Sequence, residues 1–479
     1  MGPPILAPSI DIKDQYPSNL QLNQVQIIFR HGERTPVHRT LQQWDKWGFP
    51  IFWPLCQSSC FSLTGIVNPN AQPHLVSAFP YEREIETTTG ETPSKLFTNA
   101  GKEGICLEGQ LTDKGRLSSY KLGEQIRALY IERLAFLPRT FVEQEDVYLR
   151  TTSIVRARET LQQVFAGIYP FSKASVPPKI YERFPFEENL YPTTGPCPRL
   201  RELMVQFIDA SAKKWDPLLI DAAKGFAPIL SSESKTITVG SSKESDNSWA
   251  LIDTYASALA HNIPTPPCFN DRKAVNLLAR ASLDADFSGF EFNSEMQKLG
   301  MGRFFDEVLT RMIRGDRVVS RNEAEIVKML DSKKDKLSIW RKPKLALYGA
   351  HDSSIGALLA TMGVLDRKWI NFTSHIVFEH FQETDQTLGK SSWLSTAKPK
   401  EYVRIRYNGQ PLDLPACSAA GDHLEGQRSL CTMEAFTEFV KRVSPKDYTK
   451  ECNENLKTPP PEDDVVKALA GIDNLFRRE

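Results

Sequence analysis

The hydrophobic pattern of this chain changes twice along its length. Between residues 20 and 174, and again between 336 and 455, short β-branched or aromatic runs alternate with amphipathic helical segments, the pattern of an α/β fold. The predicted strands are 25–29, 147–149, 344–348, 376–381 and 402–407. We therefore expect an α/β core in two parts, 20–174 and 336–455. A helical cap at 175–335 is inserted between them, and a peripheral tail covers 456–479.

Helical periodicity and capping residues place helices between these strands. Thr112 or Asp113 can cap a helix that ends before Pro138, and a second helix runs from Ser153 to about Gly167. The middle part shows helical periodicity without convincing strands. The other expected helices lie near 200–229, 248–261, 272–281, 303–330, 353–362 and 433–443.

Two segments lack periodicity and are expected to be loops. Residues 231–247 are rich in Ser, Lys and Glu and predict an exposed loop. Residues 37–105 are rich in Pro, Gly, Thr and aromatic side chains, and loops this long are usually functional or locally packed. Two interpretations of this longer segment stay open, apolar filler beneath the loop or an apolar wall of a substrate cleft.

Residues 30–36, Arg-His-Gly-Glu-Arg-Thr-Pro, follow the first predicted strand directly, and we call them the basic motif. Arg30 and Arg34 can grip a phosphate bidentately, and Gly32 lets the backbone turn closely. His31 lies among them as a candidate nucleophile. The alternative is a basic surface turn. The position of the motif behind an apolar strand favours a binding site.

Two later predicted strands also end in side chains that can bind a phosphate or transfer a proton. Arg150 ends one predicted strand, and His351 and Asp352 end another. If these strands and the first belong to one parallel sheet, their polar ends meet at its carboxyl edge, where α/β sheets bind anions. Alternatively, Arg150 is a plain surface residue. Arg156 and Arg158 are interpreted as groups on a helix face or behind the site.

Charge and hydropathy limit which macromolecules or membranes the chain is expected to bind. Lys+Arg and Asp+Glu both number 59, so no overall field favours nucleic acid or an anionic membrane. No apolar run is long enough to cross a bilayer, and no transmembrane segment is expected. The N-terminus lacks a signal or transit pattern, so we expect an intracellular, cytoplasmic protein. A processed or mis-started N-terminus would conceal a secretory or mitochondrial signal.

The eight cysteines are too sparse for a disulfide scaffold, and no Cys-x-x-Cys pair suggests zinc. For Cys56 and Cys60, structural or free thiols are favoured over metal ligands. No acidic cluster suggests magnesium, and no Gly-x-Gly-x-x-Gly or Walker-type loop follows a strand. We therefore expect neither a cofactor nor a metal.

Phosphoryl transfer through a histidine fits these residues. His31 would attack phosphorus while the guanidinium groups neutralise the equatorial oxygens. Asp352 would protonate the leaving group and then act as base while water hydrolyses the phosphohistidine. The protein is then a phosphate monoester hydrolase whose partner is a small phosphorylated substrate.

The same residues resemble the histidine acid phosphatase family, branch 2 of the histidine phosphatase superfamily. The matching motifs are Arg30-His31-Gly32-x-Arg34-x-Pro36, Leu111-Thr112-x-x-Gly115, Leu122-Gly123, Arg150-Thr151-Thr152, His261-Asn262, His351-Asp352 and Leu414-Pro415-x-Cys417. The run 253–264 is similar to that of lysophosphatidic acid phosphatase-type members, which suggests lysophosphatidic acid, a lysophospholipid, as substrate.

The resemblance implies a fold and a set of roles. The fold is a three-layer α/β sandwich with a central, mostly parallel sheet of the phosphoglycerate mutase type and an inserted helical cap. His31 is the phosphohistidine nucleophile and Asp352 the proton donor. The phosphate-binding residues are Arg30, Arg34, Arg150 and His351.

Other points stay open. In secreted relatives, cysteines resembling Cys197/Cys452 and Cys417/Cys431 form disulfides, but this chain shows no route to an oxidising compartment. A structural role for His261 is favoured over a catalytic one. The alternative functions are a phytase, a phosphomutase-like enzyme, or a non-catalytic module that binds a phospholipid or inositol phosphate. A mutase usually has a glutamate in the acid role, a phytase needs a strongly basic cleft, and binding alone needs no nucleophile.

Overall fold

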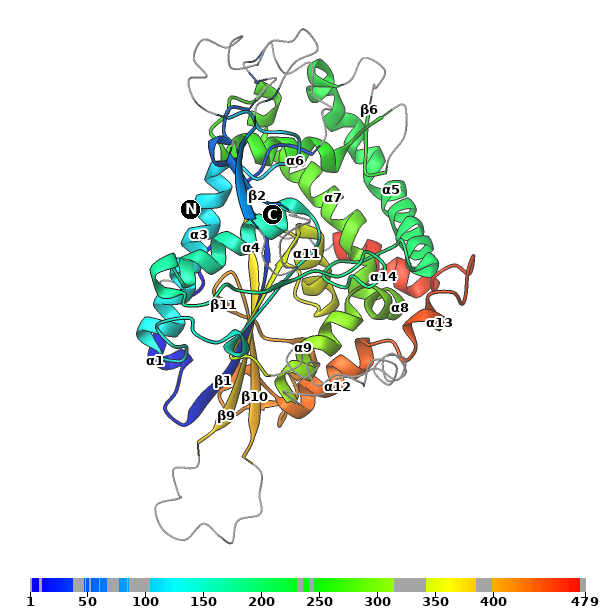
Figure 1. Cartoon of the computed structure of the whole chain (residues 1–479). Helices are drawn as coiled ribbons and strands as arrows, with labels where there is room; N and C mark the ends of the chain where they lie inside the picture. Colours follow the sequence, from blue (N-terminus) through cyan, green and yellow to red (C-terminus); the bar gives the residue numbers. More distant parts are fainter. Residues whose placement is uncertain are drawn as a thin grey trace, which may run out of the picture.

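A mixed β-sheet lies between two layers of helices (Figure 1). The structure, a computed structural model, describes residues 2–7, 11–37, 47, 49–50, 53–59, 61–66, 77–83, 85, 104–230, 236–240, 245–313, 342–384 and 399–473. The strand order of the central sheet is β12-β13-β10-β9-β1-β8-β4-β5, with β11 paired to β10. The predicted three-layer α/β class is confirmed.

One half of the sheet is parallel and the other antiparallel. The parallel half consists of β1 (Leu20–Arg30), β8 (Leu345–Ala350), β4 (Val147–Thr151) and β5 (Ile180–Tyr181). The antiparallel half consists of β9 (His375–Glu383), β10 (Glu401–Tyr407), β11 (Gln410–Pro411), β12 (His423–Leu424) and β13 (Gln427–Thr432). The sheet is therefore mixed rather than mostly parallel, because its later strands follow one another without crossover helices.

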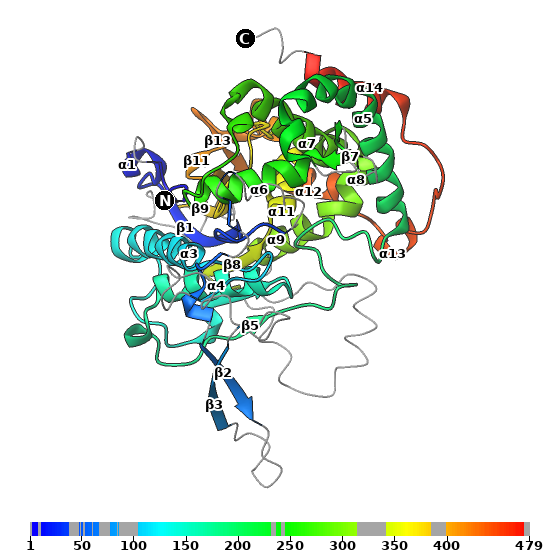
Figure 2. The same cartoon turned by 90° about the horizontal axis from the view of Figure 1, so that it is seen from above.

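Both faces of the sheet are covered, which explains the nearly continuous apolar sequence of its inner strands. Figure 2 shows α3 (Asp113–Ile126) and α4 (Val155–Ile168) on one side. On the other side lie α11 (Asp352–Thr361), α9 (Arg303–Ile313) and α12 (Met433–Val443). Side chains alternate accordingly, so that Ile27 and Phe29 join the core beneath α3 and α4, whereas Ile28 joins the opposite core.

The middle part of the chain is helical, as predicted. Its long helices are α5 (Pro198–Phe226), α6 (Ser248–Ala260) and α7 (Arg272–Phe292). They share a separate hydrophobic core around Trp215, Leu251 and Leu278. The remaining short elements are α1 (Ile12–Gln15), α8 (Ser294–Gln297), α13 (Tyr448–Glu451) and the antiparallel pair β2 (Phe61–Ile66) and β3 (Ser77–Glu82).

Some expectations fall partly outside the described residues. The helix expected over 303–330 is present as far as Ile313, and 314–330 are not described. In the expected loop 231–247, β6 (Thr236–Thr238) pairs with β7 (Ser245–Asn247). The boundaries of the cap and of the tail stay predictions. Within the tail, α14 (Glu462–Asp473) packs on the cap, and Asn293 Nδ2 donates a hydrogen bond to Asp464 Oδ2 at 2.9 Å.

Among the described cysteines, six form three disulfide bonds. The pairs are Cys56–Cys106, Cys197–Cys452 and Cys417–Cys431. The second and third are the pairs at which the family resemblance pointed, and the first was not anticipated. Across the described ranges, no helix is long and apolar enough to span a bilayer.

Candidate active site

The parallel strands β1 and β8 deliver two histidines to the same edge of the sheet. Arg30 and Ala350 are paired at the ends of these strands. The backbone N–H of the next residue, His31, donates a hydrogen bond to the Ala350 carbonyl at 3.1 Å. The ring centroids of His31 and His351 lie 5.6 Å apart. The predicted convergence of these two strand ends is therefore present.

His31 is held as a neutral ring with one nitrogen available. Its Nδ1 lies 2.9 Å from the Gly32 carbonyl oxygen, which only a protonated nitrogen can approach as a donor. Nε2 then carries the lone pair. Burial, followed by the charges of Arg156 and Arg34, holds the pKa of His31 well below its ordinary value. The ring is thus unprotonated in mild acid, as a nucleophile must be.

The turn of the basic motif rests directly on the first turn of α3. A Cβ on Gly32 would lie 2.3 Å from the Gly115 carbonyl oxygen, and one on Gly115 would lie 2.1 Å from the Glu33 carbonyl oxygen. The Gly32 N–H donates to Thr160 Oγ1 in α4 at 3.0 Å. Only glycine permits this approach, which fixes His31 against both helices of the layer.

Two arginines of the motif face a buried carboxylate from the inserted helices. Arg34 donates from Nη1 and Nη2 to the two oxygens of Asp253 in α6, at 3.0 and 2.8 Å. Arg30 Nη2 lies 4.0 Å from Asp253 Oδ1, and the Phe372 ring centroid lies 4.3 Å from the Arg30 guanidinium carbon. Asp253 is 1% exposed, so this pairing is strong and orients Arg34. Sequence reasoning had not assigned Asp253 a role.

His351 and Asp352 stand at the start of α11. Thr152 Oγ1 lies 3.0 Å from His351 Nε2, and burial, followed by the charge of Arg156, lowers the pKa of His351 to about 3. Asp352 Oδ2 lies 2.7 Å from Arg30 Nη2. Burial raises the pKa of Asp352, but the charges of Arg30 and Arg34 outweigh it, so the pKa lies below its ordinary value. Without substrate, Asp352 is a carboxylate.

The structure does not bring Arg150 together with these residues. Its guanidinium donates to Glu307 at 2.8 Å and to Glu188 and Asn189 at 2.6 Å each. The strand register gives the reason, because Arg150 is paired with Tyr348, two residues before the end of β8. Two residues of a strand span about 7 Å, so Arg150 lies inside the sheet rather than at its edge.

Arg156, which sequence reasoning set aside as a helix-face residue, is closer to the site. It is the second residue of α4, the helix that follows β4. Among neighbouring charges, that of Arg156 acts most strongly on both His31 and His351. Its Nε has no hydrogen-bond partner in the described part of the chain. Burial, followed by the charge of Arg34, lowers the pKa of Arg156 to about 10, as expected for a cation held among cations. Its place in the first turn of a helix at the sheet edge was the available signal.

A cavity of about 90 Å³ adjoins Asp352. Its other lining residues are Trp249, Leu283, Asp286, Phe287, Ser353, Trp369 and Ile370. Most of these side chains are aromatic or aliphatic, so the cavity suits carbon atoms next to a polar group.

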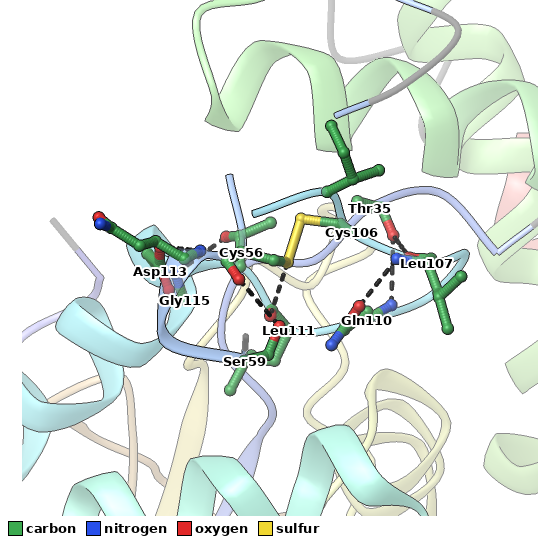
Figure 3. The surroundings of a disulfide bond; sticks show 12 residues. Thr35, Cys56, Ser59, Cys106, Leu107, Gln110, Leu111, Asp113 and Gly115 are labelled. Carbon is green, nitrogen blue, oxygen red and sulfur yellow. Dashed lines mark hydrogen bonds between the residues drawn. A yellow bond between two sulfur atoms is a disulfide. The ribbon is translucent and has the colours of Figure 1, made fainter. Parts of the chain in front are cut away.

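The end of the basic motif is braced by the Cys56–Cys106 disulfide (Figure 3). Thr35 Oγ1 donates to the Leu107 carbonyl oxygen at 2.6 Å, next to the bonded cysteine. Trp53, Cys56 and Cys106 form a small hydrophobic core, so the part of segment 37–105 around Trp53 and Cys56 is locally packed. Most of that segment lies outside the described residues.

Both ring nitrogens of His261 lie within hydrogen-bond distance of protein oxygens. Its Nδ1 lies 2.7 Å from the Ser257 carbonyl oxygen, and its Nε2 lies 2.8 Å from Thr112 Oγ1. Both ring nitrogens are occupied, which agrees with the structural alternative. Within the described ranges, no group of three or more His, Cys, Asp or Glu side chains is placed to hold a metal ion.

A family model described as histidine phosphatase superfamily (branch 2) matches residues 21–408, a span that contains every site residue named above. The chain belongs to this superfamily. It is therefore a histidine phosphatase of the acid phosphatase and phytase type, a phosphoric monoester hydrolase.

Individual relatives agree with this assignment. A probable acid phosphatase of Schizosaccharomyces pombe is 30% identical, over 94% of this chain and 96% of that protein. Human lysophosphatidic acid phosphatase type 6 is 26% identical, over 91% of this chain and 87% of that protein. Among solved structures, the apo phytase of Hafnia alvei matches with a TM-score of 0.56 at 14% identity, covering 91% of this chain and 99% of that one. This last likeness supports the fold alone.

Proposed function

We propose that this histidine phosphatase hydrolyses phosphate monoesters through a phosphohistidine on His31. Nε2 attacks phosphorus in line, the bond from phosphorus to the alcohol oxygen breaks, and Asp352 gives its proton to that oxygen. Water then attacks the phosphohistidine and leaves its proton on Asp352, which releases phosphate and restores neutral His31. The observation that carries the proposal is the neutral, oriented His31 ring beside three arginines.

Four side chains would hold the phosphate. Arg30, Arg34 and Arg156 supply positive charge around His31, and His351, oriented by Thr152, supplies a ring nitrogen. We propose Arg156 in place of Arg150, because Arg150 already neutralises two buried carboxylates. A phosphate among the three guanidinium groups would satisfy donors that have no hydrogen-bond partner among the described residues, including Arg30 Nε and Arg156 Nε.

The charge of the substrate would also prepare the acid. In the free protein, Arg30 and Arg34 keep Asp352 ionised. A bound phosphate is negative and compensates those arginines, so the pKa of Asp352 rises and the carboxyl takes up a proton in mild acid. Turnover is therefore expected to favour acidic pH.

Lysophosphatidic acid is the proposed substrate. Support comes from the human relative with that name and from the apolar cavity beside Asp352. A phytase-type substrate, whose many phosphates carry negative charge, fits less well, because the charged groups lining this cavity are the carboxyls of Asp286 and Asp352. The presence of an aspartate in the acid position also weighs against a phosphomutase, and a binding module would need neither His31 nor Asp352.

The proposal is tested by trapping the intermediate. Wild-type protein is mixed with ³²P-labelled lysophosphatidic acid at pH 5 and quenched in alkali, which preserves phosphohistidine. We expect label on the peptide that contains His31, and neither label nor phosphate release from His31→Ala. His423→Gln, altered on β12 at the far edge of the sheet, is the control and should label normally. Turnover by His31→Ala close to that of the wild type would disprove the nucleophile assignment.

The intracellular location stays a prediction. The three disulfide bonds weigh against it, because cytosolic thiols are kept reduced. The compartment can be tested together with the disulfides, as described below.

A further inference from the structure

The cavity beside Asp352 is built from four parts of the chain. Trp249 comes from α6, Asp286 and Phe287 come from α7, Asp352 begins α11, and Trp369 lies in the segment before β9. The ring centroids of Trp249 and Trp369 lie 6.3 Å apart. The cavity is thus an aromatic chamber with two carboxyl groups in its wall.

The chamber shares lining residues with the phosphate site. Asp352 lines the chamber and also contacts Arg30. Ile370, another lining residue, accepts a hydrogen bond from Arg30 Nη1 through its carbonyl oxygen. The alcohol oxygen of a substrate has to reach Asp352 to be protonated. The carbon atoms attached to that oxygen then extend into the chamber.

The walls of the chamber are fixed before any ligand binds. Arg367, in the same segment as Trp369, pairs through Nε with Asp284 at 3.2 Å and through Nη2 with Glu291 at 2.6 Å, both on α7. These ion pairs join the segment that carries Trp369 to α7, which carries Asp286 and Phe287. Since the walls are preformed, little ordering opposes binding.

Asp286 differs from its neighbour Asp284 in having no such partner. No hydrogen bond or ion pair joins Asp286 to any residue in the described ranges, and the charge that acts on it is that of Asp352. Burial, followed by this negative charge, raises the pKa of Asp286 to about 7. In mild acid its carboxyl is neutral, and it can both donate and accept a hydrogen bond, as a hydroxyl partner requires.

We propose that the chamber is the subsite for the alcohol and that Asp286 binds a hydroxyl group of the substrate close to its ester oxygen. The proposal rests on the proposed function and assigns its substrates to the esters of short polyols, the class of glycerol phosphates to which lysophosphatidic acid belongs. The size agrees, because an apolar cavity of about 150 Å³ holds benzene, so 90 Å³ holds about four non-hydrogen atoms. An acyl chain on the glycerol would continue beyond the chamber.

The test compares two esters that differ only in hydroxyl groups, glycerol 3-phosphate and propyl phosphate, at pH 5. For the wild type we expect kcat/KM to be at least about tenfold higher for glycerol 3-phosphate, since an unmade buried hydrogen bond costs roughly a factor of 5 to 150. In Asp286→Leu the ratio should fall to about one. Asp286→Asn, which keeps a donor and an acceptor, should retain part of the preference.

Asp221→Asn is the matched control, because Asp221 is exposed on α5 and pairs only with Lys224 among the described residues. It should leave both the ratio and the rates unchanged. A wild type without preference, or Asp286→Leu with an intact preference, would overturn the proposal. An equal loss on both esters in Asp286→Asn would assign Asp286 to proton transfer instead and would also overturn it. The proposed function itself fails only if phosphate release does not depend on His31.

Discussion

At the residue scale, the proposed mechanism requires opposite protonation states of two groups that lie near the same arginines. His31 has to be neutral, and burial together with the arginines lowers its pKa. Asp352 has to be protonated, and Arg30 and Arg34 oppose this by stabilising its anion. On this proposal, bound phosphate compensates the arginines only while substrate is present, so acid catalysis depends on occupation of the site.

The role of Asp352 can be separated from binding by the choice of leaving group. Asp352→Asn should lower kcat by roughly 10² to 10⁴-fold for an alkyl ester, whose alkoxide needs a proton. The loss should be smaller for p-nitrophenyl phosphate, whose leaving group is stable as an anion. The measurement is kcat for both esters from pH 4 to 8. Equal losses on the two esters would contradict the assignment of Asp352 as proton donor.

The third arginine of the site can be assigned by comparing three variants. Arg156→Ala should weaken inhibition by vanadate at least tenfold with little change in stability, because Arg156 supplies charge beside His31. Arg150→Ala should instead cost about 3–5 kcal/mol of unfolding free energy, because it leaves the buried carboxylate of Glu188 without its ion-pair partner and removes one of the three arginines that pair with Glu307. Arg158→Ala, on the same helix as Arg156 but half exposed, is the control. The measurements are vanadate inhibition and urea unfolding.

If Arg150→Ala proved stable but insensitive to vanadate, Arg150 would belong to the phosphate site after all. The present assignment would also fail if Arg156→Ala bound vanadate as the wild type does.

At the element scale, the positions of strands and helices along the chain were largely predictable, but the register between neighbouring strands was not. The apolar runs gave β1, β4 and β8, and Thr112 caps α3 as expected, accepting a hydrogen bond from the Gly115 N–H. Periodicity contains no information on register. The sequence therefore could not reveal that Arg150 lies two residues below the sheet edge, opposite Tyr348.

Contacts between distant elements were the other part that could not be predicted. Asp253 lies 219 residues from Arg34 and comes from the inserted helices. Nothing local to either residue points to the pair, whereas Arg30, His31 and Asp352 follow strands and could be placed by topology. The place of Asp286 in the chamber wall could not be predicted either, because its local sequence is that of a polar residue in an amphipathic helix.

The Cys56–Cys106 disulfide lies next to one such distant contact, the hydrogen bond from Thr35 to the Leu107 carbonyl oxygen. It joins residues 50 positions apart, so its removal should cost about 4 kcal/mol of unfolding free energy by loop-closure entropy. The Cys56→Ser, Cys106→Ser double variant should also raise KM, because Thr35 is held next to Cys106. The measurements are urea unfolding and phosphate-release kinetics.

Cys268→Ser, at the cysteine described as free, is the control for that variant. Thiol labelling in the intact cell, before lysis, tests the compartment at the same time. Labelling of Cys268 alone among the described cysteines would indicate an oxidising compartment, and labelling of all of them would support the intracellular expectation. A double variant as stable as the wild type would contradict the predicted contribution.

At the scale of the whole molecule, the site lies where the sheet edge meets the inserted helices. In the proposed mechanism, the end of β1 and the turn after it supply the nucleophile and two arginines, α4 supplies Arg156, and α11 begins with the proton donor. The inserted α6 and α7 supply Asp253 and part of the chamber wall. On this proposal, the inserted helices determine the substrate preference, and the elements at the sheet edge determine the reaction.

The buried histidines make a final prediction about the whole molecule. His351, His375 and His380 have pKa values of about 3, 4 and 3, lowered by burial, and that of His31 is well below the ordinary 6.5. In the unfolded chain each takes up a proton near pH 6.5, whereas in the folded protein it does not. The unfolded state therefore binds more protons below that pH, and the free energy of unfolding falls as the solution is acidified.

Each such histidine removes at most about 1.4 kcal/mol per pH unit below 6.5, until its folded pKa is reached. The raised pKa values of Asp284 and Asp286, about 6 and 7, act in the opposite direction and offset part of this loss. We expect the free energy of unfolding in urea to decrease between pH 6.5 and 5, by less than the histidines alone would give. His375→Gln should make this decrease shallower, because it removes one of these buried rings. Added phosphate should recover part of the loss, because it binds the folded site alone. A stability that stayed level down to pH 5 would contradict this expectation.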